Sequence, residues 1–562
     1  MELKENIAKA AADAAGLDYK DILDMLEVPP DSNMGDLALP CFRMAKLLRL
    51  SPQKIAQDLQ SKMERPEGVS KVELQGGYVN FFFDRSAFAR DTLSTVDAAE
   101  AFGSSGMGQG RRVVIDYSSV NIAKPFHIGH LSSTAIGNSL YKIYKYLGFT
   151  PVGINHLGDW GTQFGKLIAA YKHWGDDRDI EENSVSAMLK LYVRFHEEAK
   201  SDESLNDEGR AWFKKIEDGD PEALRIFGWF SELTLREAKR VYAMLGIEFD
   251  HFTGESFYND KMDPVIEELR QKNLLELDEG AYIVRLDEYS LPPCIVLKTD
   301  GATLYSTRDL AAAEYRMKTF DFYKALYVVA YQQSLHFRQL FAVLEKMGKP
   351  WAGRCEHVAF GMVSLEDGTL STREGKIVLL EDVLNRSIEK TLATINEKNP
   401  ELENKEDVAR QVGIGAVLYS TLSAGRIKDI TFSFDRVLNF DGETGPYVQY
   451  THARASSVLR KFDGAPGGED YSALDNDTAF AVVRQIADFP SAVTAAANKN
   501  EPSIITRHIT LLAQYFNKYY YEYRIMDGDE PATKARIQLT RAVQKTIRTG
   551  LSLLGIAAPE RM

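Results

Sequence analysis

From residue 111 onward, short apolar runs alternate with longer segments whose apolar residues recur at helical spacing. Residues 111–118 (RRVVIDYS) precede a helical pattern that ends at Gly148, and residues 150–155 (TPVGIN) follow it directly. Residues 325–331 (ALYVVAY) and 355–360 (CEHVAF) flank another helical segment. Strands that alternate with helices form a parallel sheet whose binding site lies at the carboxyl ends of the strands. The sequence therefore predicts an α/β fold with a Rossmann-like parallel sheet.

The length of 562 residues is too great for a single hydrophobic core. We expect an α/β unit over residues 1–105, a Rossmann-like domain over 106–395 and an all-α helical bundle over 396–562, because strand signals nearly vanish after about residue 395. The glycine-rich residues 103–110 (GSSGMGQG) predict a linker. A helical, charged pattern at about 170–290 predicts an insertion into the second domain.

Composition argues against several classes of protein. No apolar run is long enough to span a bilayer, and the first 16 residues lack the apolar core of a signal peptide. The three cysteines, Cys41, Cys294 and Cys355, form no CxxC pair, which argues against a cysteine zinc site and favours a reducing cytoplasm. The net charge of -14 argues against a surface that binds nucleic acid throughout, but local basic surfaces remain open.

Residues 121–131 (NIAKPFHIGHL) lie where the first predicted strand passes into a helix. A helix N-terminus attracts phosphate, Gly129 allows a nucleotide to approach the backbone, and His127 and His130 can donate to phosphate oxygens. The chain has no GxxxxGK[ST] phosphate loop, and no third ligand stands at a familiar spacing for a histidine metal site. The segment predicts a site that holds a nucleotide while charge builds on its α-phosphate, with no metal bound by the protein.

The tetrapeptide HIGH after a strand resembles the nucleotide-binding signature of class I aminoacyl-tRNA synthetases. The longer string at residues 116–138 (DYSSVNIAKPFHIGHLSSTAIGN) is similar to that of the arginyl-tRNA synthetases. Further blocks resemble that family in its own order: residues 155–167 (NHLGDWGTQFGKL), 304–316 (LYSTRDLAAAEYR), 443–454 (ETGPYVQYTHAR) and 553–562 (LLGIAAPERM). The resemblance thus covers nearly the whole chain.

This resemblance implies a reaction in two steps. Arginine attacks the α-phosphate of ATP to give arginyl-adenylate and pyrophosphate, and the arginyl group then moves to the 3′-terminal adenosine of tRNA(Arg). The implied cofactor is ATP with Mg²⁺, and the implied partners are L-arginine and tRNA(Arg). We expect a cytoplasmic monomer with no membrane association.

An arginine site needs carboxylates, because a buried guanidinium is permanently charged and pairs with them in bidentate geometry. Asp116 ends the first predicted strand, and Asp309 begins a helix with Tyr305 one turn earlier. From its position alone, Asp309 is better explained as a charge that stabilises a helix N-terminus. The resemblance assigns it to arginine, together with Asp116, Ser118, Asn121, His127, Tyr305 and Gln333.

For ATP, the resemblance implies His127, Gly129 and His130, with the two histidines as catalytic groups. The family's lysine-rich loop KMSKS corresponds here to TLSTR, in which threonines replace both lysines and only Ser371 matches. The leaving pyrophosphate still needs a cation. Arg373 and Lys376 are candidates, and Lys124 is favoured because members with a degenerate loop resemble this chain in having a lysine just before the signature.

For tRNA, the resemblance implies one contact surface at each end of the chain. In residues 75–83 (QGGYVNFFF) these are Gln75, Tyr78 and Asn80, and in the C-terminal bundle, which resembles an anticodon-binding domain, they are Tyr447, Gln449, His452 and Arg454. Arg541, Lys545 and Arg548 share one predicted helix face. That face is either a solvated surface or a site for an RNA backbone.

Two other functions stay open at this point. A different class I ligase or nucleotidyl transferase would use the same sheet with another amino-acid pocket, and the set Asp116, Tyr305 and Asp309 argues against it. An RNA-binding relative without catalysis is favoured only by the altered TLSTR loop, and the intact His127 and His130 argue against it.

Overall fold

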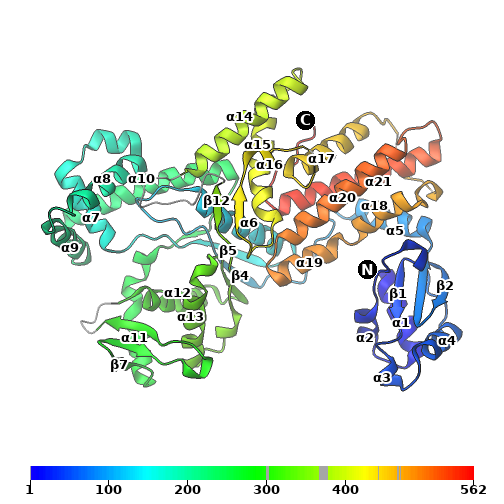
Figure 1. The fold of residues 1–562 in the computed structure, drawn as a ribbon, viewed down its shortest axis with the longest axis horizontal. Coiled ribbons are helices and arrows are strands. Elements are labelled where there is room, and N and C mark those ends of the chain that lie inside the picture. The colour runs from blue at the N-terminus through cyan, green and yellow to red at the C-terminus, as the bar shows by residue number, and fades with distance from the viewer. Residues whose placement is uncertain (1, 299–302, 366–377, 441, 465–466, 469) are drawn as a thin grey trace. The chain divides into compact units, whose positions relative to one another are not determined.

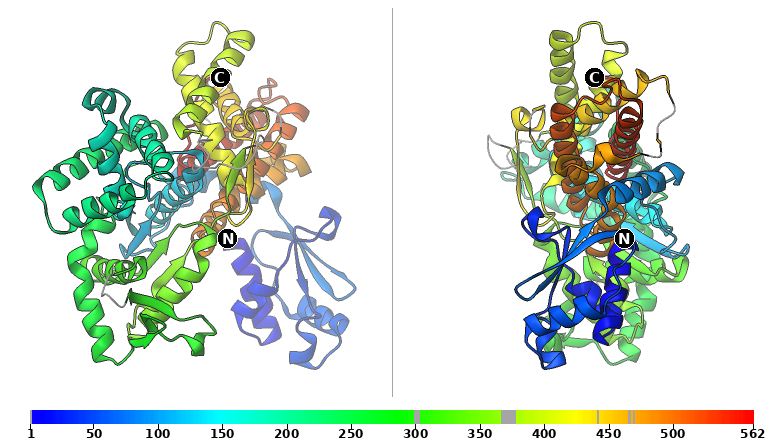
Figure 2. Two further views of the ribbon diagram at one scale, coloured as in Figure 1. Left: turned by 60° about the vertical axis from the view of Figure 1, so that its left-hand side comes forward. Right: turned by 90° about the vertical axis from the view of Figure 1, so that its right-hand side faces the viewer.

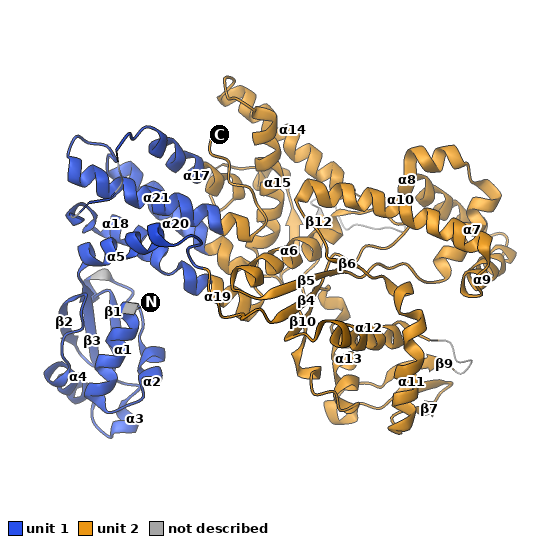
Figure 3. Ribbon diagram, turned by 180° about the vertical axis from the view of Figure 1, so that it is seen from behind, with its two compact units in different colours: residues 1–103, 451–492, 508–549 blue, residues 104–450, 493–507, 550–562 orange. Residues whose placement is uncertain are grey.

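The structure is a computed structural model that describes residues 2–298, 303–365, 378–440, 442–464, 467–468 and 470–562. Its contacts divide the chain into two compact units, each built from separate segments (Figure 3). Unit 1 comprises residues 1–103, 451–492 and 508–549, and unit 2 comprises residues 104–450, 493–507 and 550–562. These two units do not follow the boundaries of the three expected domains. The three domains therefore remain a proposal.

Unit 2 is built on a parallel sheet of five strands in the order β11-β10-β4-β5-β6. The strands are β4 (Arg112–Asp116), β5 (Thr150–Asn155), β6 (His251–Phe252), β10 (Lys324–Tyr327) and β11 (Cys355–His357). Buried aliphatic residues fill β4 and β5 because helices cover both faces of such a sheet. The predicted α/β class and Rossmann-like sheet are therefore confirmed.

The order of these strands reverses between β4 and β10. From β4 the chain proceeds to β5 and β6 on one side, and later strands add β10 and β11 on the other. A ligand site in an open parallel sheet lies at such a reversal, beyond the carboxyl ends of the strands. The helices that border this point are α6 (Leu131–Tyr146), α12 (Tyr305–Phe320) and α13 (Ser334–Lys346). Asp116 ends β4 and therefore stands at the reversal.

The segment expected as one helical insertion is helical in its first part only. Four helices follow β5 in Figure 1: α7 (Thr162–Trp174), α8 (Asp177–Glu198), α9 (Ser204–Glu217) and α10 (Pro221–Leu245). The chain then returns to the main sheet as β6, adds helix α11 (Met262–Gln271), and forms an antiparallel sheet of β7 (Glu276–Asp278), β8 (Ala281–Val284) and β9 (Cys294–Lys298). β6 has only two residues, too few to show a strand pattern in the sequence.

Helices dominate the later part of unit 2, as expected, with one exception. α14 (Leu380–Lys398) and α15 (Lys405–Ser423) run side by side in Figures 1 and 2. The exception is β13 (Ile430–Phe432), which pairs in parallel with β12 (Val363–Leu365). Further helices of the C-terminal part are α16 (Phe434–Val437), α17 (Gly445–Arg460), α18 (Asp477–Ala487), α19 (Phe489–Lys499), α20 (Ser503–Glu522) and α21 (Glu530–Leu553).

The N-terminal part of unit 1 forms an antiparallel sheet in the order β1-β3-β2 with its own hydrophobic core. The predicted hairpin is present: β2 and β3 pair around Gly76, whose φ of 61° suits glycine. The elements are α1 (Glu2–Ala15), α2 (Tyr19–Met25), β1 (Leu37–Pro40), α3 (Ala45–Leu48), α4 (Pro52–Lys62), β2 (Val69–Gln75), β3 (Tyr78–Phe83) and α5 (Arg85–Ala98).

Candidate active site

The segment with the two histidines joins the end of β4 to the start of α6. Its backbone is left-handed at Ser118, Ser119 and Ala123, so the chain turns sharply instead of continuing as strand or helix. A short 3-10 turn, Ile128–His130, then leads into α6. The histidines therefore lie at the helix N-terminus beside the reversal of strand order, where an anionic ligand is favoured.

The hydrogen bonds of His127 indicate its tautomer. The backbone N–H of Gly129 donates to His127 Nδ1 at 3.0 Å, so the neutral His127 ring carries its proton on Nε2. His130 Nδ1 lies near both the N–H of His127, at 3.3 Å, and the carbonyl of His127, at 3.2 Å, and these two contacts favour opposite tautomers. Burial lowers the pKa of His130 to about 3, and burial with the nearby Lys124 charge lowers the pKa of His127. Both rings are neutral at pH 7, and His127 presents an Nε2–H donor.

The segment that follows the predicted TLSTR loop supports these histidines. Ile128 N–H donates to the Val378 carbonyl at 3.1 Å, and Leu380 N–H donates to the Phe126 carbonyl at 2.9 Å. Ser371, Arg373 and Lys376, which were predicted to contact ATP, lie outside the described residues. The described backbone nevertheless brings the end of that stretch to the two imidazoles.

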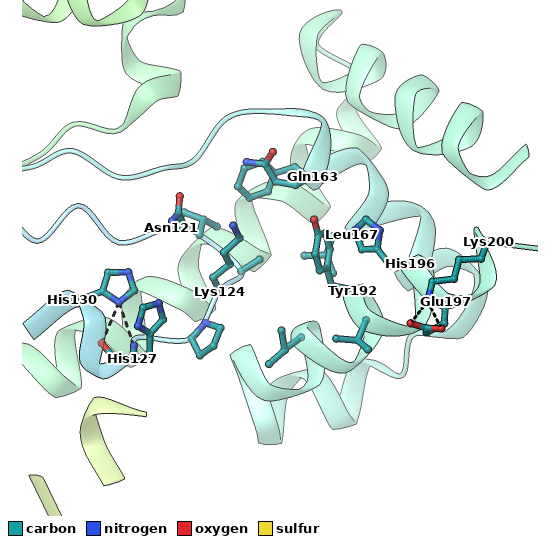
Figure 4. Close-up of a pocket in the computed structure, with 16 residues that line it drawn as sticks. Asn121, Lys124, His127, His130, Gln163, Leu167, Tyr192, His196, Glu197 and Lys200 are labelled. Atoms are coloured by element: carbon teal, nitrogen blue, oxygen red, sulfur yellow. Dashed lines mark hydrogen bonds and ion pairs between the residues drawn. The ribbon is translucent and has the colours of Figure 1, made fainter. Parts of the chain in front are cut away.

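A cavity of about 600 Å³ opens beside the histidines (Figure 4). One wall is the signature segment, with Asn121, Lys124 and His127, and the opposite wall includes Tyr192 and His196 of α8. Lys124 is exposed to the cavity. Of the three cations predicted to face the pyrophosphate, Lys124 is therefore the one that belongs to the described residues, and it lies beside His127.

Asn121 is fixed by the glycine-containing loop after β5. Ile122 N–H donates to the Gly158 carbonyl at 3.0 Å, and Gly158 N–H donates to the Val120 carbonyl at 3.1 Å. A Cβ atom added at Gly158 would lie 2.1 Å from Asn121 Oδ1. The position of the Asn121 amide therefore requires glycine at residue 158. This contact joins two of the sequence blocks that resemble the family, residues 116–138 and 155–167.

Asp116 lies in the site but already has a cationic partner. Its Oδ2 is 2.7 Å from Arg316 Nη2, and both side chains are buried. Asp116 Oδ1 accepts a hydrogen bond from Ser119 Oγ at 3.1 Å. Ser118, the serine predicted to contact arginine, instead bonds to Tyr242 Oη at 2.7 Å and is buried. The hydroxyl beside Asp116 thus belongs to Ser119.

Asp309 begins the buried face of α12, and two imidazoles lie against it. His336 Nε2 donates to Asp309 Oδ2 at 2.6 Å, and His156 Nε2 lies 3.8 Å from Oδ1. Burial alone would raise the pKa of Asp309, but the His336 hydrogen bond and the His156 and Arg316 charges lower it. Asp309 is therefore a carboxylate at pH 7. Tyr305 is exposed, with its ring 4.9 Å from that of His336.

The two carboxylates are connected through side chains that the sequence did not indicate. Arg316 Nη2 lies 3.5 Å from His156 Nδ1, so Asp116, Arg316, His156 and Asp309 form a continuous chain. Arg316 is 1% exposed and its charge is permanent. Since it offsets Asp116, Asp309 is the carboxylate of this pair with capacity for an added cation. Gln333, at the end of a 3-10 turn before α13, is exposed.

The predicted tRNA contacts of unit 1 differ in accessibility. Gln75 is exposed and Tyr78 is partly exposed, with its ring 5.4 Å from that of Phe42. Asn80 is 3% exposed because it lies in the central strand of the three-stranded sheet. Its amide is not available to RNA, and the prediction for Asn80 is therefore withdrawn.

The predicted contacts on α17 also separate into two kinds. Gln449 is buried and its Nε2 donates to the carbonyls of Gln411 (3.2 Å) and Ala557 (2.8 Å), so it joins parts of the chain. His452 is likewise fully buried. Both side chains have structural positions and are withdrawn as RNA contacts. Tyr447 and Arg454 are partly exposed, and Arg454 Nη1 donates to Asn517 Oδ1 at 2.6 Å.

The basic face of α21 is partly used inside unit 1. Lys545 Nζ donates to the Val96 carbonyl at 2.7 Å and also to the Ala99 carbonyl, while Arg541 Nε lies 3.4 Å from Asp97 Oδ1. Lys545 and Arg541 thus bind the C-terminal end of α5. The last carbonyls of a helix have no partner within the helix, and cations near them are stabilising. Arg541 is nevertheless exposed, as expected of a solvated face, whereas Lys545 is partly buried by its contacts with α5. The RNA site stays a prediction.

Among the described residues, no group of three or more histidines, cysteines or acidic residues is arranged to hold a metal ion. No helix in the described part of the chain is long and apolar enough to cross a membrane.

Family models match the chain in three consecutive segments. Residues 1–83 match the N-terminal domain of arginyl tRNA synthetase, and residues 95–434 match the catalytic domain of class I (R) tRNA synthetases. Residues 448–562 match the DALR anticodon binding domain. These matches follow the order of the blocks recognised in the sequence.

Individual proteins agree with these models. The chain is 52% identical to an arginine–tRNA ligase of Alkaliphilus metalliredigens over 97% of both chains, and 49% identical to one of Clostridium botulinum over the full length of both. Its fold matches Thermus thermophilus arginyl-tRNA synthetase with a TM-score of 0.84 at 27% identity, covering both chains completely. The Plasmodium falciparum enzyme shares the fold at 20% identity, with a TM-score of 0.82.

Proposed function

This chain belongs to the class I arginyl-tRNA synthetases, and from that premise we propose which of its residues carry each part of the reaction. The chain ligates L-arginine to tRNA(Arg) at the expense of ATP. Arginine and ATP first form arginyl-adenylate and pyrophosphate, and the arginyl group then passes to the 3′-terminal adenosine of the tRNA. Similarity over the whole length to arginine–tRNA ligases carries this conclusion.

His127 and His130 act on ATP as neutral hydrogen-bond donors. The Nε2–H group of His127, and that of His130 in its Nε2–H tautomer, would meet phosphate oxygens beside the N-terminus of α6, where the helix dipole also favours negative charge. A neutral donor suits this task because it holds the phosphate without releasing a proton as charge builds. Gly129 leaves the backbone open to the nucleotide.

Lys124 supplies the positive charge that faces the leaving pyrophosphate. It lines the cavity beside His127, and its ammonium is a flexible point charge suited to phosphate. Ser371, Arg373 and Lys376 stay in the proposal as ATP contacts from the TLSTR loop.

Asp309 receives the guanidinium of the substrate. It is ionised, lies at the reversal of strand order and, among the described residues, forms no ion pair with a lysine or an arginine. Asp116, whose charge is offset by Arg316, shapes the same pocket with Ser119. We assign Tyr305 to one side of this pocket, and Asn121, Gln333 and His127 to the α-amino and carboxylate groups of arginine. Ser118 is replaced by Ser119 in this assignment.

Contacts with tRNA(Arg) are proposed from both ends of the chain. Gln75 and Tyr78 would meet an unpaired base, which can stack on the Tyr78 ring. Tyr447 and Arg454 would contact the anticodon side, since their segment matches or borders the anticodon-binding model. A partly exposed aromatic ring and an arginine are common means of holding single-stranded bases.

Mg²⁺ is proposed to accompany ATP. The described part of the chain offers no cluster of three metal ligands, and Mg²⁺ commonly binds nucleotides through phosphate oxygens and water. When bound, it would neutralise phosphate charge, while His127, His130 and Lys124 orient the nucleotide. We further propose a monomer in the cytoplasm, where the three cysteines would stay as the free thiols of this structure.

The experiment that tests this function is the exchange of labelled pyrophosphate into ATP, with each of the twenty amino acids offered in turn. Both arms, with and without total tRNA, are needed because activation can depend on tRNA. We expect exchange with arginine alone. Exchange with a different amino acid would indicate another class I ligase. A folded protein that exchanges with none would be an RNA-binding relative without catalysis.

A further inference from the structure

Asp309 is held from two sides by imidazoles that come from different elements. His336 on α13 donates to Oδ2 at 2.6 Å, a length typical of a charge-assisted hydrogen bond. His156, in the loop after β5, has its Nε2 3.8 Å from Oδ1. Both imidazoles are largely buried. The carboxylate is thus oriented by the chain before any ligand arrives.

The His336 ring is itself fixed by aromatic neighbours. Its centroid lies 4.9 Å from that of Tyr305 on α12 and 5.2 Å from that of Phe337. Phe337 in turn stacks on His357 at 4.5 Å, and His357 Nε2 donates to the Val329 carbonyl at 2.9 Å. These contacts continue from the pocket to β11 and the end of β10, so the ring has little freedom to turn.

A carboxylate needs a fixed plane to bind a guanidinium through two parallel hydrogen bonds. The terminal torsion of aspartate is broad, so the plane is not set by the side chain alone. A carboxylate has about four lone-pair positions, and His336 takes one of them. The remaining positions, on both oxygens, stay available to a planar fork of donors.

We propose that His336 is a positioning residue that sets the plane of the Asp309 carboxylate for the guanidinium of arginine. This inference rests on the proposed role of Asp309 and adds to it. His336 acts through Asp309 and touches neither ATP nor the reacting atoms. Its loss therefore weakens arginine binding in ground state and transition state alike, which raises KM and leaves kcat.

The test compares variants of His336 in steady-state aminoacylation with arginine and ATP varied separately. His336→Ala removes the donor, and His336→Gln places an amide N–H near the position of Nε2. For His336→Ala we expect the KM for arginine to rise about tenfold to a hundredfold, with kcat and the KM for ATP within about twofold. His336→Gln should recover most of the loss.

His173→Ala is the matched control. His173 on α7 also bonds a carboxylate, Glu208, at 2.7 Å, but at the exposed surface of the helical insertion. The KM of the His173→Ala variant for arginine should equal that of the unchanged chain. If thermal unfolding shows that His336→Ala does not fold, His336→Leu fills the ring's space without a donor and replaces it in the comparison.

Two outcomes would overturn the inference. One is a folded donor-free variant whose KM for arginine stays within about twofold of the unchanged chain. The other is His336→Gln as impaired as His336→Ala with kcat falling in both, which would indicate a general structural role. Asp309→Asn, measured alongside, distinguishes a failure of the His336 inference from a failure of the proposed role of Asp309. If Asp309→Asn also leaves the KM for arginine unchanged, the proposed role of Asp309 fails as well.

Discussion

The guanidinium of Arg316 and the carboxylate of Asp116 form an ion pair at 2.7 Å inside unit 2. Arg316 is 1% exposed, and its Nε has no hydrogen-bond partner among the described residues. The pair stands in the pocket proposed for arginine, so the enzyme keeps a guanidinium of its own next to the site for the substrate's guanidinium. Asp116 is consequently occupied, and in the proposed assignment the discrimination of the substrate falls to Asp309.

Removing Arg316 should destabilise the protein strongly. Arg316→Met leaves Asp116 buried without its partner, a change that costs about 3–5 kcal/mol. Urea unfolding followed by circular dichroism measures the loss. Arg285→Met is the control, since Arg285 pairs with Glu276 at 2.8 Å on the exposed surface and such pairs contribute about 1 kcal/mol or less. Equal midpoints for the two variants would contradict the role of the buried pair.

Lys124→Ala should slow adenylate formation while the protein stays folded. The leaving pyrophosphate loses its nearest described cation, and removal of one such group costs about a hundredfold in rate in comparable sites. Single-turnover formation of adenylate measures the step. Lys200→Ala is the control, because Lys200 lines the same cavity but is paired with Glu197 at 2.8 Å. A near-normal rate for Lys124→Ala would assign the charge to Arg373 or Lys376.

Acid should destabilise the unit that contains His130. Burial lowers the pKa of His130 from 6.5 to about 3, so between these values the unfolded chain binds a proton that the folded chain does not. Stability from this group is complete above pH 6.5 and is lost as pH falls, by about 1.4 kcal/mol per pH unit. Unfolding free energy measured from pH 7 to pH 5 should therefore fall less steeply in His130→Asn. An unchanged slope in His130→Asn would show that His130 is not buried in a neutral form.

Tyr78→Ala should weaken tRNA binding without affecting the small substrates. A stacked base contributes about 1–3 kcal/mol, so the KM for tRNA should rise about tenfold. Pyrophosphate exchange at saturating tRNA should keep its KM values for arginine and ATP. Tyr19→Ala, at another exposed tyrosine of the same N-terminal part, is the control. Equal tRNA KM values for both variants would remove Tyr78 from the interface.

The sequence predicted the positions that depend on local pattern. Asp116 follows from the end of an apolar strand, and His127 and His130 follow from a strand-to-helix junction, so the sheet, its helices and the nucleotide end of the site could be expected. The partners of these residues could not, because Arg316 is 200 positions from Asp116 in the chain. Only the fold brings them together, and the same is true of His156 and His336 at Asp309.

Backbone conformation and burial account for the other differences. Ser118 and Ser119 are adjacent and both left-handed, and that geometry decides which hydroxyl reaches Asp116. The resemblance implied that Gln449 and Asn80 contact tRNA and are therefore exposed, but buried amides can satisfy backbone groups, as Gln449 does. No spacing rule in the sequence distinguishes such an amide from an exposed one.

The most direct test of the account is the KM for arginine of Asp309→Asn in aminoacylation. Asparagine keeps the shape but removes the charge, and losing one partner of a buried charge pair costs about 2–5 kcal/mol. We predict a KM for arginine at least about thirtyfold higher, with the KM for ATP within about twofold. A KM for arginine that stays within about threefold of the unchanged chain would contradict the assignment of Asp309 as the carboxylate that recognises the substrate.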